Sequence, residues 1–381
     1  MKPIEINTLE DFIHEISSHI KKIDLYIEIL DKIESDEYSK IDGGLFKSTF
    51  LINEFKKLNS AVVAKKKTDS EESGGYDYLV RILSKMASSS NNSLTKEYIT
   101  ERNSKEFDDS LEHLKQNISN IRKACPLVFY YRGEADSNWD TTPSVLRDEY
   151  SWSRESFFFH EIQVRCPSDF NNLTFLGKLV TMQHYNCPTR LLDITANPLN
   201  ALYFACESKD DLDGKVIFFP MIQGTISYGD ADRALILSCI PHLTYEEQQM
   251  LYNDIRKDLN KLVYHGDPSL HYLNKLLLEI KTEKPSFEPR IEYGDLLNPL
   301  LVQPNMTNPR IANQQGAFLL SGLSESHSDI VKKINARIAD TQIIIPKERK
   351  QDILQQLNSI GINKGTIYPN MEQVAEYLKS L

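Results

Sequence analysis

The hydrophobic residues near the start of the chain recur at spacings of three and four, as on one face of an amphipathic helix. This stripe consists of Phe12, Ile16, Ile20, Ile23, Ile27 and Leu30. Thr8 and Asp11 have the spacing of a capping box, which satisfies free backbone N–H groups at a helix N-terminus. We therefore predict one helix over residues 8–34.

The chain up to residue 118 is predicted to be a mainly helical region with flexible loops. A second apolar segment at 46–58 and a helical stretch at 104–122 alternate with two polar stretches, KKKTDSEESGG (65–75) and SSSNNS (88–93). Polar stretches of this composition are typical of loops. We assign 1–118 to this first region and 119–381 to a second domain.

From residue 127 the pattern changes to short apolar runs separated by helical periodicity. Runs rich in β-branched and aromatic residues predict strands, at LVFYYRGE (127–134), KVIFFPMI (215–222), QGAFLLSG (315–322) and TQIIIP (341–346). Helices are predicted at 153–165, 172–184, from Asn197-Pro198 onward, 347–358 with Gly361 as the C-cap, and 371–381. Because strands and helices alternate irregularly, we expect an α+β fold.

The net charge of the chain bears on whether its partner is a nucleic acid. The chain has 54 acidic and 44 basic side chains and a net charge of −10, which does not favour nucleic acid as a partner. Its five cysteines are scattered without a C-x-x-C pair, so neither a metal site nor a disulfide framework is predicted. No apolar run approaches the roughly 18 residues of a membrane span. We expect a cytoplasmic protein.

One segment, QHYNCPTRLLDIT (183–195), collects an unusual number of polar groups, including His184, Thr189, Arg190 and Asp193. Two interpretations are open. The segment could bind a charged ligand, or it could be a polar bracket in which Asp193 pairs with Arg190 and His184 caps the loop.

Four stretches together are similar to the FRG domain, a family named for a Phe/Tyr-Arg-Gly signature. They are YYRGEADSNWDTTPSVLRD, QHYNCPTRLLDITANPLNALYFA, RIANQQGAF and IYPNMEQVAEYL. The resemblance covers about 118–381, so residues 30–118 would be an insertion. FRG domains are distantly similar to ADP-ribosyltransferases, which implies a split antiparallel or mixed sheet flanked by helices, with NAD as the substrate.

The resemblance implies roles for individual residues. Arg132, at the end of a strand, would hold the diphosphate of NAD, because a guanidinium binds two oxygens at once and keeps its charge. Gly133 would let the ligand approach the backbone. The alternative for Arg132 is an ion pair with Glu134 or Asp193.

In the second motif, Arg190 would bind a phosphate or an acceptor and His184 a ribose hydroxyl. Thr189 would replace a serine that transferases carry, and Tyr185 would stack on a base. Cys187 is also a candidate nucleophile beside His184, although an ordinary loop residue is the simpler interpretation.

The third transferase motif normally supplies a catalytic Glu, whereas this chain has Gln314 and Gln315 in RIANQQGAF. A Gln can hydrogen-bond a ribose hydroxyl but offers no negative charge to a developing cation. A carboxylate from elsewhere, such as Glu134, Glu155 or Glu161, would then be needed. Arg310 has the alternative role of a charge at a strand edge.

Two classes of function follow. The first is an ADP-ribosyltransferase-like enzyme or NAD glycohydrolase that acts as a bacterial toxin or in anti-phage defence, with Arg132, His184 and Gln315 as catalytic residues. The second is a non-catalytic module that binds a nucleotide-like molecule or a protein in the same pocket. In either case the helical region is a candidate contact for a protein acceptor or partner.

Overall fold

A computed structural model of the chain describes residues 3–17, 127–222, 226–257, 263–305, 309–335, 338 and 342–380. The predictions for 46–58, 65–75, 88–93 and 104–122 lie outside the described residues. Of the predicted helix at 8–34, the described part is helical over 9–17. Its capping box is confirmed, because Asp11 N donates to Thr8 Oγ1 at 3.1 Å and Thr8 N donates to Asp11 Oδ2 at 3.0 Å.

The chain divides into two compact units, each built from separate stretches of sequence. The first contains 1–137, 202–225 and 337–360, and the second contains 138–201, 226–336 and 361–381. The boundary at 201 falls inside helix α8 (Pro198–Cys206). Both units combine strands with helices, which confirms the α+β class.

Four strands form the framework of the first unit, in the order β1-β10-β4-β2. They are β1 (Pro3–Glu5), β10 (Gln342–Ile345), β4 (Gly214–Ile222) and β2 (Leu127–Glu134). The β1–β10 pair is parallel and the other two pairs are antiparallel. The continuous apolar run of β4 is buried on both faces, as its sequence predicts. Helix α15 (Lys350–Ser359) follows β10 after a 3₁₀ turn at Lys347–Arg349.

The second unit has its own group of four strands, in the order β3-β9-β8-β5. They are β3 (Leu191–Thr195), β9 (Gly316–Leu320), β8 (Leu300–Gln303) and β5 (Ser227–Tyr228). Here too the pairing is mixed, with β5 and β8 parallel and the others antiparallel. A separate two-stranded sheet pairs β6 (Val263–Tyr264) with β7 (Ile291–Glu292).

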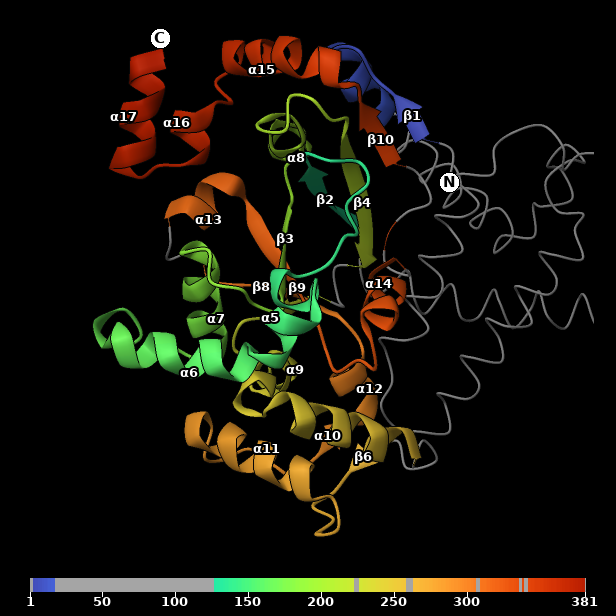
Figure 1. Cartoon of the computed structure of the whole chain (residues 1–381), viewed down its shortest axis with the longest axis vertical. Coiled ribbons are helices and arrows are strands. Elements are labelled where there is room, and N and C mark those ends of the chain that lie inside the picture. The colour runs from blue at the N-terminus through green and yellow to red at the C-terminus, as the bar shows by residue number, and fades with distance from the viewer. Residues whose placement is uncertain are drawn as a thin grey trace, which may run out of the picture. The chain divides into compact units, whose positions relative to one another are not determined.

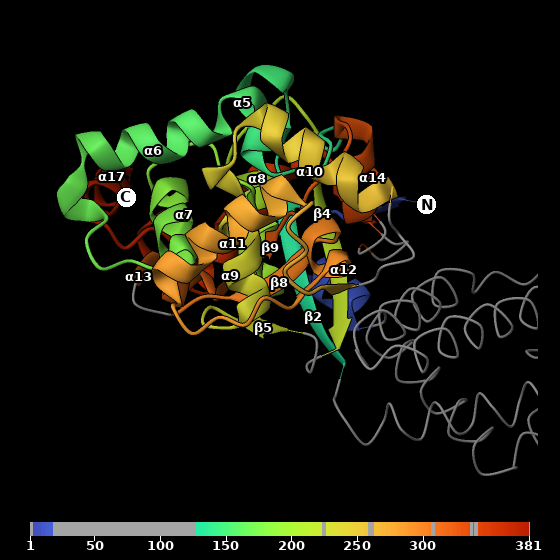
Figure 2. The ribbon, with the colours of Figure 1, turned by 90° about the horizontal axis from the view of Figure 1, so that it is seen from below.

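Helices surround the strands of the second unit, and α10 and α11 pack side by side (Figures 1 and 2). The α-helices are α5 (Glu149–Ser153), α6 (Glu155–Arg165), α7 (Phe175–His184), α9 (Asp232–Ser238), α10 (Tyr245–Lys257), α11 (His271–Glu283), α12 (Tyr293–Leu297), α13 (Pro309–Gln314), α14 (His327–Asn335), α16 (Lys364–Ile367) and α17 (Met371–Ser380). Short 3₁₀ turns lie at Ser144–Leu146, Pro167–Asp169 and Ile240–His242.

The core of the second unit is one continuous apolar cluster. Side chains from α6, α7 and the helices α9 to α12 pack there against β8 and β9. Fully enclosed members include Leu191, Leu251, Leu276 and Leu320. The polar segment singled out from the sequence lies directly beside this cluster, because Leu191 begins β3.

Most predicted elements of the second domain are confirmed, and one is corrected. The strands at 127–134, 215–222, 315–322 and 341–346 and the helices at 153–165, 172–184, 347–358 and 371–381 are present within a few residues. Asn197 caps α8, accepting from Leu199 N at 2.9 Å, and Gly361 follows α15 with φ +83°. The segment 183–195 is not one loop, since its last five residues form β3.

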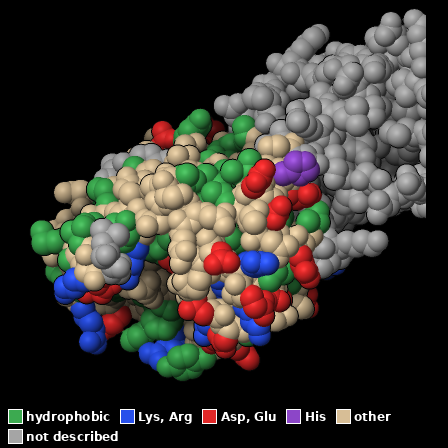
Figure 3. Space-filling model, turned by 90° about the horizontal axis from the view of Figure 1, so that it is seen from above, with side chains coloured by type: hydrophobic (Ala, Val, Ile, Leu, Met, Phe, Trp, Pro, Cys, Tyr) green, Lys and Arg blue, Asp and Glu red, His purple; other side chains and the backbone are tan. Residues whose placement is uncertain are grey.

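No helix in the described part of the chain is long and apolar enough to cross a membrane. On the face drawn in Figure 3, the described acidic and basic side chains lie beside one another. This mixing agrees with the charge balance of the sequence.

Candidate functional site

The second motif, QHYNCPTRLLDIT (183–195), folds as the end of a helix, a turn and a strand. Gln183 makes hydrogen bonds to both sides of the turn. Gln183 lies in the last turn of α7, and its Nε2 donates to Asp193 Oδ2 at 2.7 Å. Thr189 Oγ1 donates to Gln183 Oε1. The Thr189 backbone is held from the other side, where its N donates to Ser144 Oγ at 3.1 Å. Thr189 and Asp193 therefore form a polar bracket around Gln183, which the sequence interpretation did not single out.

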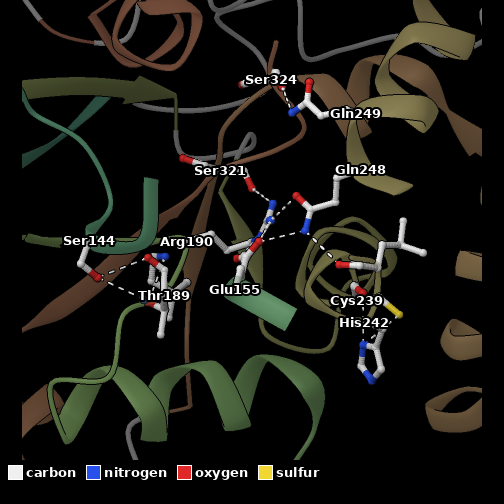
Figure 4. A network of polar contacts seen from close by, with 12 residues as sticks. Ser144, Glu155, Thr189, Arg190, Cys239, His242, Gln248, Gln249, Ser321 and Ser324 are labelled. Atoms are coloured by element: carbon white, nitrogen blue, oxygen red, sulfur yellow. Dashed lines mark hydrogen bonds and ion pairs between the residues drawn. The ribbon is translucent and has the colours of Figure 1, made fainter. Parts of the chain in front are cut away.

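Arg190 points away from this bracket into the core, where it is 1% exposed. Figure 4 shows its guanidinium between Glu155, Gln248 and Ser321. Its Nε donates to Glu155 Oε1 at 2.8 Å and its Nη1 to the Ser321 carbonyl at 3.0 Å, while Nη2 donates to Glu155 Oε2. These contacts give Arg190 a structural role. Its use for a phosphate stays a prediction that would require the network to open.

The partner of Arg190 corrects the structural interpretation of the sequence. An ion pair with Asp193 was expected, but the carboxylate is Glu155 in the first turn of α6. Gln248 Nε2 donates to the same carboxylate at 3.0 Å, so all the donors around Glu155 are buried. Side chains alternate across a strand, which places exposed Asp193 on a different face from the core.

His184 and Tyr185 lie at the end of α7 and remain accessible. Their rings meet edge to face with centroids 4.9 Å apart, and Tyr185 is 64% exposed. Within the described residues neither side chain makes a hydrogen bond. Burial, and then the positive charge of Arg310, lower the pKa of His184, which keeps the imidazole neutral at pH 7. The structural alternative, in which His184 caps the loop, is therefore not observed.

Arg310 belongs to the third motif and brings a cation to this surface. It lies on α13, which neighbours α7 in both ribbon views (Figures 1 and 2). Its guanidinium carbon lies 5.0 Å from the ring centre of Tyr368, in the IYPN segment. Three motifs far apart in the sequence thus contribute to one side of the second unit. The alternative of a lone strand-edge charge for Arg310 is wrong, because Arg310 is helical.

The two glutamines of the third motif end α13. Gln314 Nε2 donates to the Ile367 carbonyl at 3.3 Å, and its own carbonyl accepts from Thr195 Oγ1 at 2.6 Å. Gln315 adopts φ +47°, a left-handed conformation that closes the helix and starts β9. The Gln315 side chain is exposed and makes no hydrogen bond within the described residues.

Arg132 and Gly133 lie at the end of β2, in the first unit. Arg132 Nε donates to Glu134 Oε1 at 2.8 Å, and Lys215 Nζ lies 3.2 Å from Glu134 Oε2. Glu134 is 2% exposed, so this carboxylate holds two cations inside the unit. Gly133 is paired with Val216 of β4. The pairing of Arg132 with Glu134 agrees with the structural alternative for Arg132.

The carboxylates considered as substitutes for a catalytic Glu are each in an ion pair. Glu134 and Glu155 are buried with their partners, and Glu161 contacts Arg165 on the surface of α6 at 2.6 Å. Among tyrosines, Tyr130, Tyr131 and Tyr203 are core residues.

Neither Cys187 nor Cys239 is an activated thiol. Burial raises the pKa of Cys187. Cys239 lies 3.8 Å from His242 Nδ1, but it is fully buried and its pKa is also raised. The described residues contain no group of three or more His, Cys, Asp or Glu side chains that could hold a metal ion.

Residues 128–214 match the family model of the FRG domain. This segment is therefore an FRG domain, as its motifs predict. The match runs from β2 to the start of β4 and includes the whole second motif. The extension of the domain to residue 381 stays a prediction. No curated protein and no solved structure matches the chain.

Proposed function

We propose that this FRG domain binds a nucleotide-like anion, with NAD as the first candidate, through His184, Tyr185 and Arg310. The observation that carries the proposal is the grouping of these side chains. A guanidinium suits a phosphate, an exposed tyrosine suits a base, and a neutral imidazole suits a ribose hydroxyl. The His184 and Tyr185 side chains make no hydrogen bond within the described residues, so neither has to give one up to bind a ligand.

Binding is favoured over catalysis by the state of the carboxylates. Transfer of ADP-ribose passes through a positively charged ribose, which an enzyme stabilises with a negative group. Gln314 serves to end α13, and Glu134, Glu155 and Glu161 are all engaged by cations. A binding module needs none of these carboxylates. A role for Arg132 and Gly133 in holding a diphosphate stays a prediction from the family resemblance.

A second candidate is an NAD glycohydrolase or ADP-ribosyltransferase, with Arg132, His184 and Gln315 as catalytic residues. The observation that favours it is the free imidazole of His184, whose lowered pKa makes it a neutral base at pH 7. It could accept the proton of a water or an acceptor hydroxyl that attacks the ribose while nicotinamide leaves. An ADP-ribosyltransferase-like fold, a cytoplasmic setting and a role as a toxin or in anti-phage defence belong to this proposal through the family resemblance.

Calorimetric titration of the full-length protein with NAD and with ADP-ribose tests the binding proposal. Tyr185→Ala and Arg310→Gln should each weaken binding about tenfold or more. Tyr228→Ala is a matched control, because Tyr228 is 61% exposed and lies at the edge strand β5. Loss of affinity in the control as well, or no binding of either nucleotide, would contradict the proposal.

Release of nicotinamide from NAD separates the two candidates. A binding module retains NAD intact and is stabilised by it against heat. An enzyme releases nicotinamide, and His184→Ala and Arg132→Ala abolish the release while the protein stays folded. Release that survives both substitutions would exclude the proposed residues.

A further inference from the structure

Helices α5 and α6 carry an exposed apolar surface that the proposed nucleotide site does not use. The two helices follow one another along one edge of the second unit (Figure 2). Tyr150 is 65% exposed, Phe157 48% and Val164 74%. Phe157 and Val164 are seven residues apart in one helix, which is about two turns, so they lie on the same side. Single exposed apolar residues are common, but a group of them marks an interaction site.

Arg154, at the junction of α5 and α6, connects the members of this group. Its guanidinium carbon lies 5.1 Å from the ring centre of Tyr150, 4.7 Å from that of Phe157 and 5.5 Å from that of Phe158. Its Nη1 also donates to the Tyr150 hydroxyl. Phe158 packs against the core of the unit, so the stacked rings join the cation to a rigid base. Three rings therefore fix the position of one charge at the surface.

Arg154 forms no ion pair within the described residues. No carboxylate of the described residues lies within ion-pair distance of its guanidinium, although Arg165 on the same helix is paired with Glu161. A guanidinium is always charged and presents a planar fork that matches a carboxylate. The fixed position of Arg154 means that little side-chain freedom is lost when such a partner binds.

We propose that Tyr150, Arg154, Phe157 and Val164 form a docking surface for a protein partner. The partner presents an Asp or Glu carboxylate to Arg154 and an adjacent apolar side chain to Phe157 and Val164. Aromatic residues and Arg are the types enriched at the centres of protein interfaces. A single carboxylate needs to approach only Arg154, whereas an extended anionic membrane surface would also face the exposed Asp148 and Glu149 and is the poorer occupant. The surface is independent of nucleotide binding.

Fluorescence anisotropy with the full-length protein tests this surface. The probe is a labelled synthetic peptide in which Glu alternates with Leu and Phe, and the reference is the same peptide with Lys in place of Glu. The Glu peptide should bind and the Lys peptide should not. Arg154→Gln and Phe157→Ser should each weaken binding about tenfold or more. Arg165→Gln is the matched control and should bind as the unmodified protein does. Thermal unfolding of each variant, measured alongside, separates a loss of binding from a loss of folded protein.

Several outcomes would overturn the proposal. Equal binding of the two peptides, binding that survives Arg154→Gln, or no binding of the Glu peptide would each exclude an acidic partner. Sedimentation of the protein alone addresses a second copy of the chain as the occupant. Self-association that Phe157→Ser removes would assign the surface to contacts between copies. Flotation with vesicles of phosphatidylserine, if lost in Phe157→Ser, would assign it to a lipid surface.

Discussion

The guanidinium of Arg190 and the carboxylate of Glu155 form an ion pair inside the second unit, although 35 residues separate them in the sequence. The pair joins the start of β3 to the start of α6, and Gln248 brings α10 into the same network. A motif that looks like a binding site in the sequence therefore divides into two parts. Arg190 and Thr189 hold the fold together, while His184 and Tyr185 remain accessible.

Replacing Glu155 with Leu should destabilise the protein by about 3–5 kcal/mol, because Arg190 would be left as an unpaired buried charge. The double variant Glu155→Leu, Arg190→Met should recover much of that loss, since neither charge remains. Urea unfolding measures both. The control is Arg165→Gln, which removes the exposed Arg165–Glu161 ion pair. It should change the free energy of unfolding by less than about 0.5 kcal/mol. If Glu155→Leu lowered the free energy of unfolding no more than the control, the network around Arg190 would contribute little to stability.

Lys350 should behave as a structural cation of the first unit. Its ammonium is fully buried and donates to the carbonyls of Ala135, Ser208 and Lys209 at 2.7, 3.0 and 2.9 Å. Lys350→Met leaves three carbonyls without this donor and should cost about 3 kcal/mol in the free energy of unfolding. Lys347→Met, on the exposed turn before α15, should be close to neutral. Equal unfolding midpoints for the two variants would count against this role.

His242 should make stability fall in mild acid. Its ring packs against Phe159 and Phe175, and burial lowers its pKa to about 4. Because the unfolded chain binds this proton near pH 6.5 and the folded protein only near pH 4, stability is lost as the pH falls through that window. The loss is at most about 3 kcal/mol.

Unfolding of the wild type and of His242→Phe, compared from pH 7 to pH 4, isolates the contribution of this ring. The neighbours Glu279, His160 and Lys178 are present in both proteins, so the difference between the two curves reports the protonation of His242 together with its interactions with them. The variant should show a shallower fall in stability. Parallel curves for the two proteins would mean that His242 is not the group responsible.

Gly214, at the start of β4, should not tolerate a side chain. An added Cβ would collide with the backbone carbonyl of Ala205 and crowd that of Glu134. Both obstacles are backbone atoms that cannot move aside, so Gly214→Ala should cost more than about 2 kcal/mol. Gly294 lies in helix α12, and the nearest atom to a Cβ added there would be 3.8 Å away. Gly294→Ala should therefore leave the free energy of unfolding unchanged or raise it slightly. Thermal unfolding of the two variants provides the comparison.

Elements with a strong local pattern could be predicted from the sequence. The apolar run of β4, the periodicity of α7 and the cap at Asn197 each depend on neighbouring residues. The strand β3 was missed because its apolar run is short and adjoins a polar segment. It is fixed by pairing with β9, more than a hundred residues later. Sequence patterns also assign no element to 223–314, where the helices owe their stability to tertiary packing.

The sequence was sufficient to select the residues of the candidate site, but it did not show which of them contact one another. The motifs identify the family and select His184, Tyr185 and Arg190, but residue types alone do not separate a buried guanidinium from an accessible one. The partner of Arg190 could not be deduced, since nothing in the local sequence of α6 relates Glu155 to a residue 35 positions later. Lys350 likewise lies in the polar run KERKQD, and its burial depends on carbonyls from distant segments.

The pairing of β10 has a consequence for how the protein folds while it is being synthesised. β10 bonds to β1 on one side and to β4 on the other. A ribosome therefore releases residues 3–5 and 214–222 long before their common neighbour at 342–345 exists. Until then both strands keep an open edge, which is a template for pairing with another nascent chain. Newly synthesised chains that stall before residue 342 should therefore be the ones most in need of a chaperone.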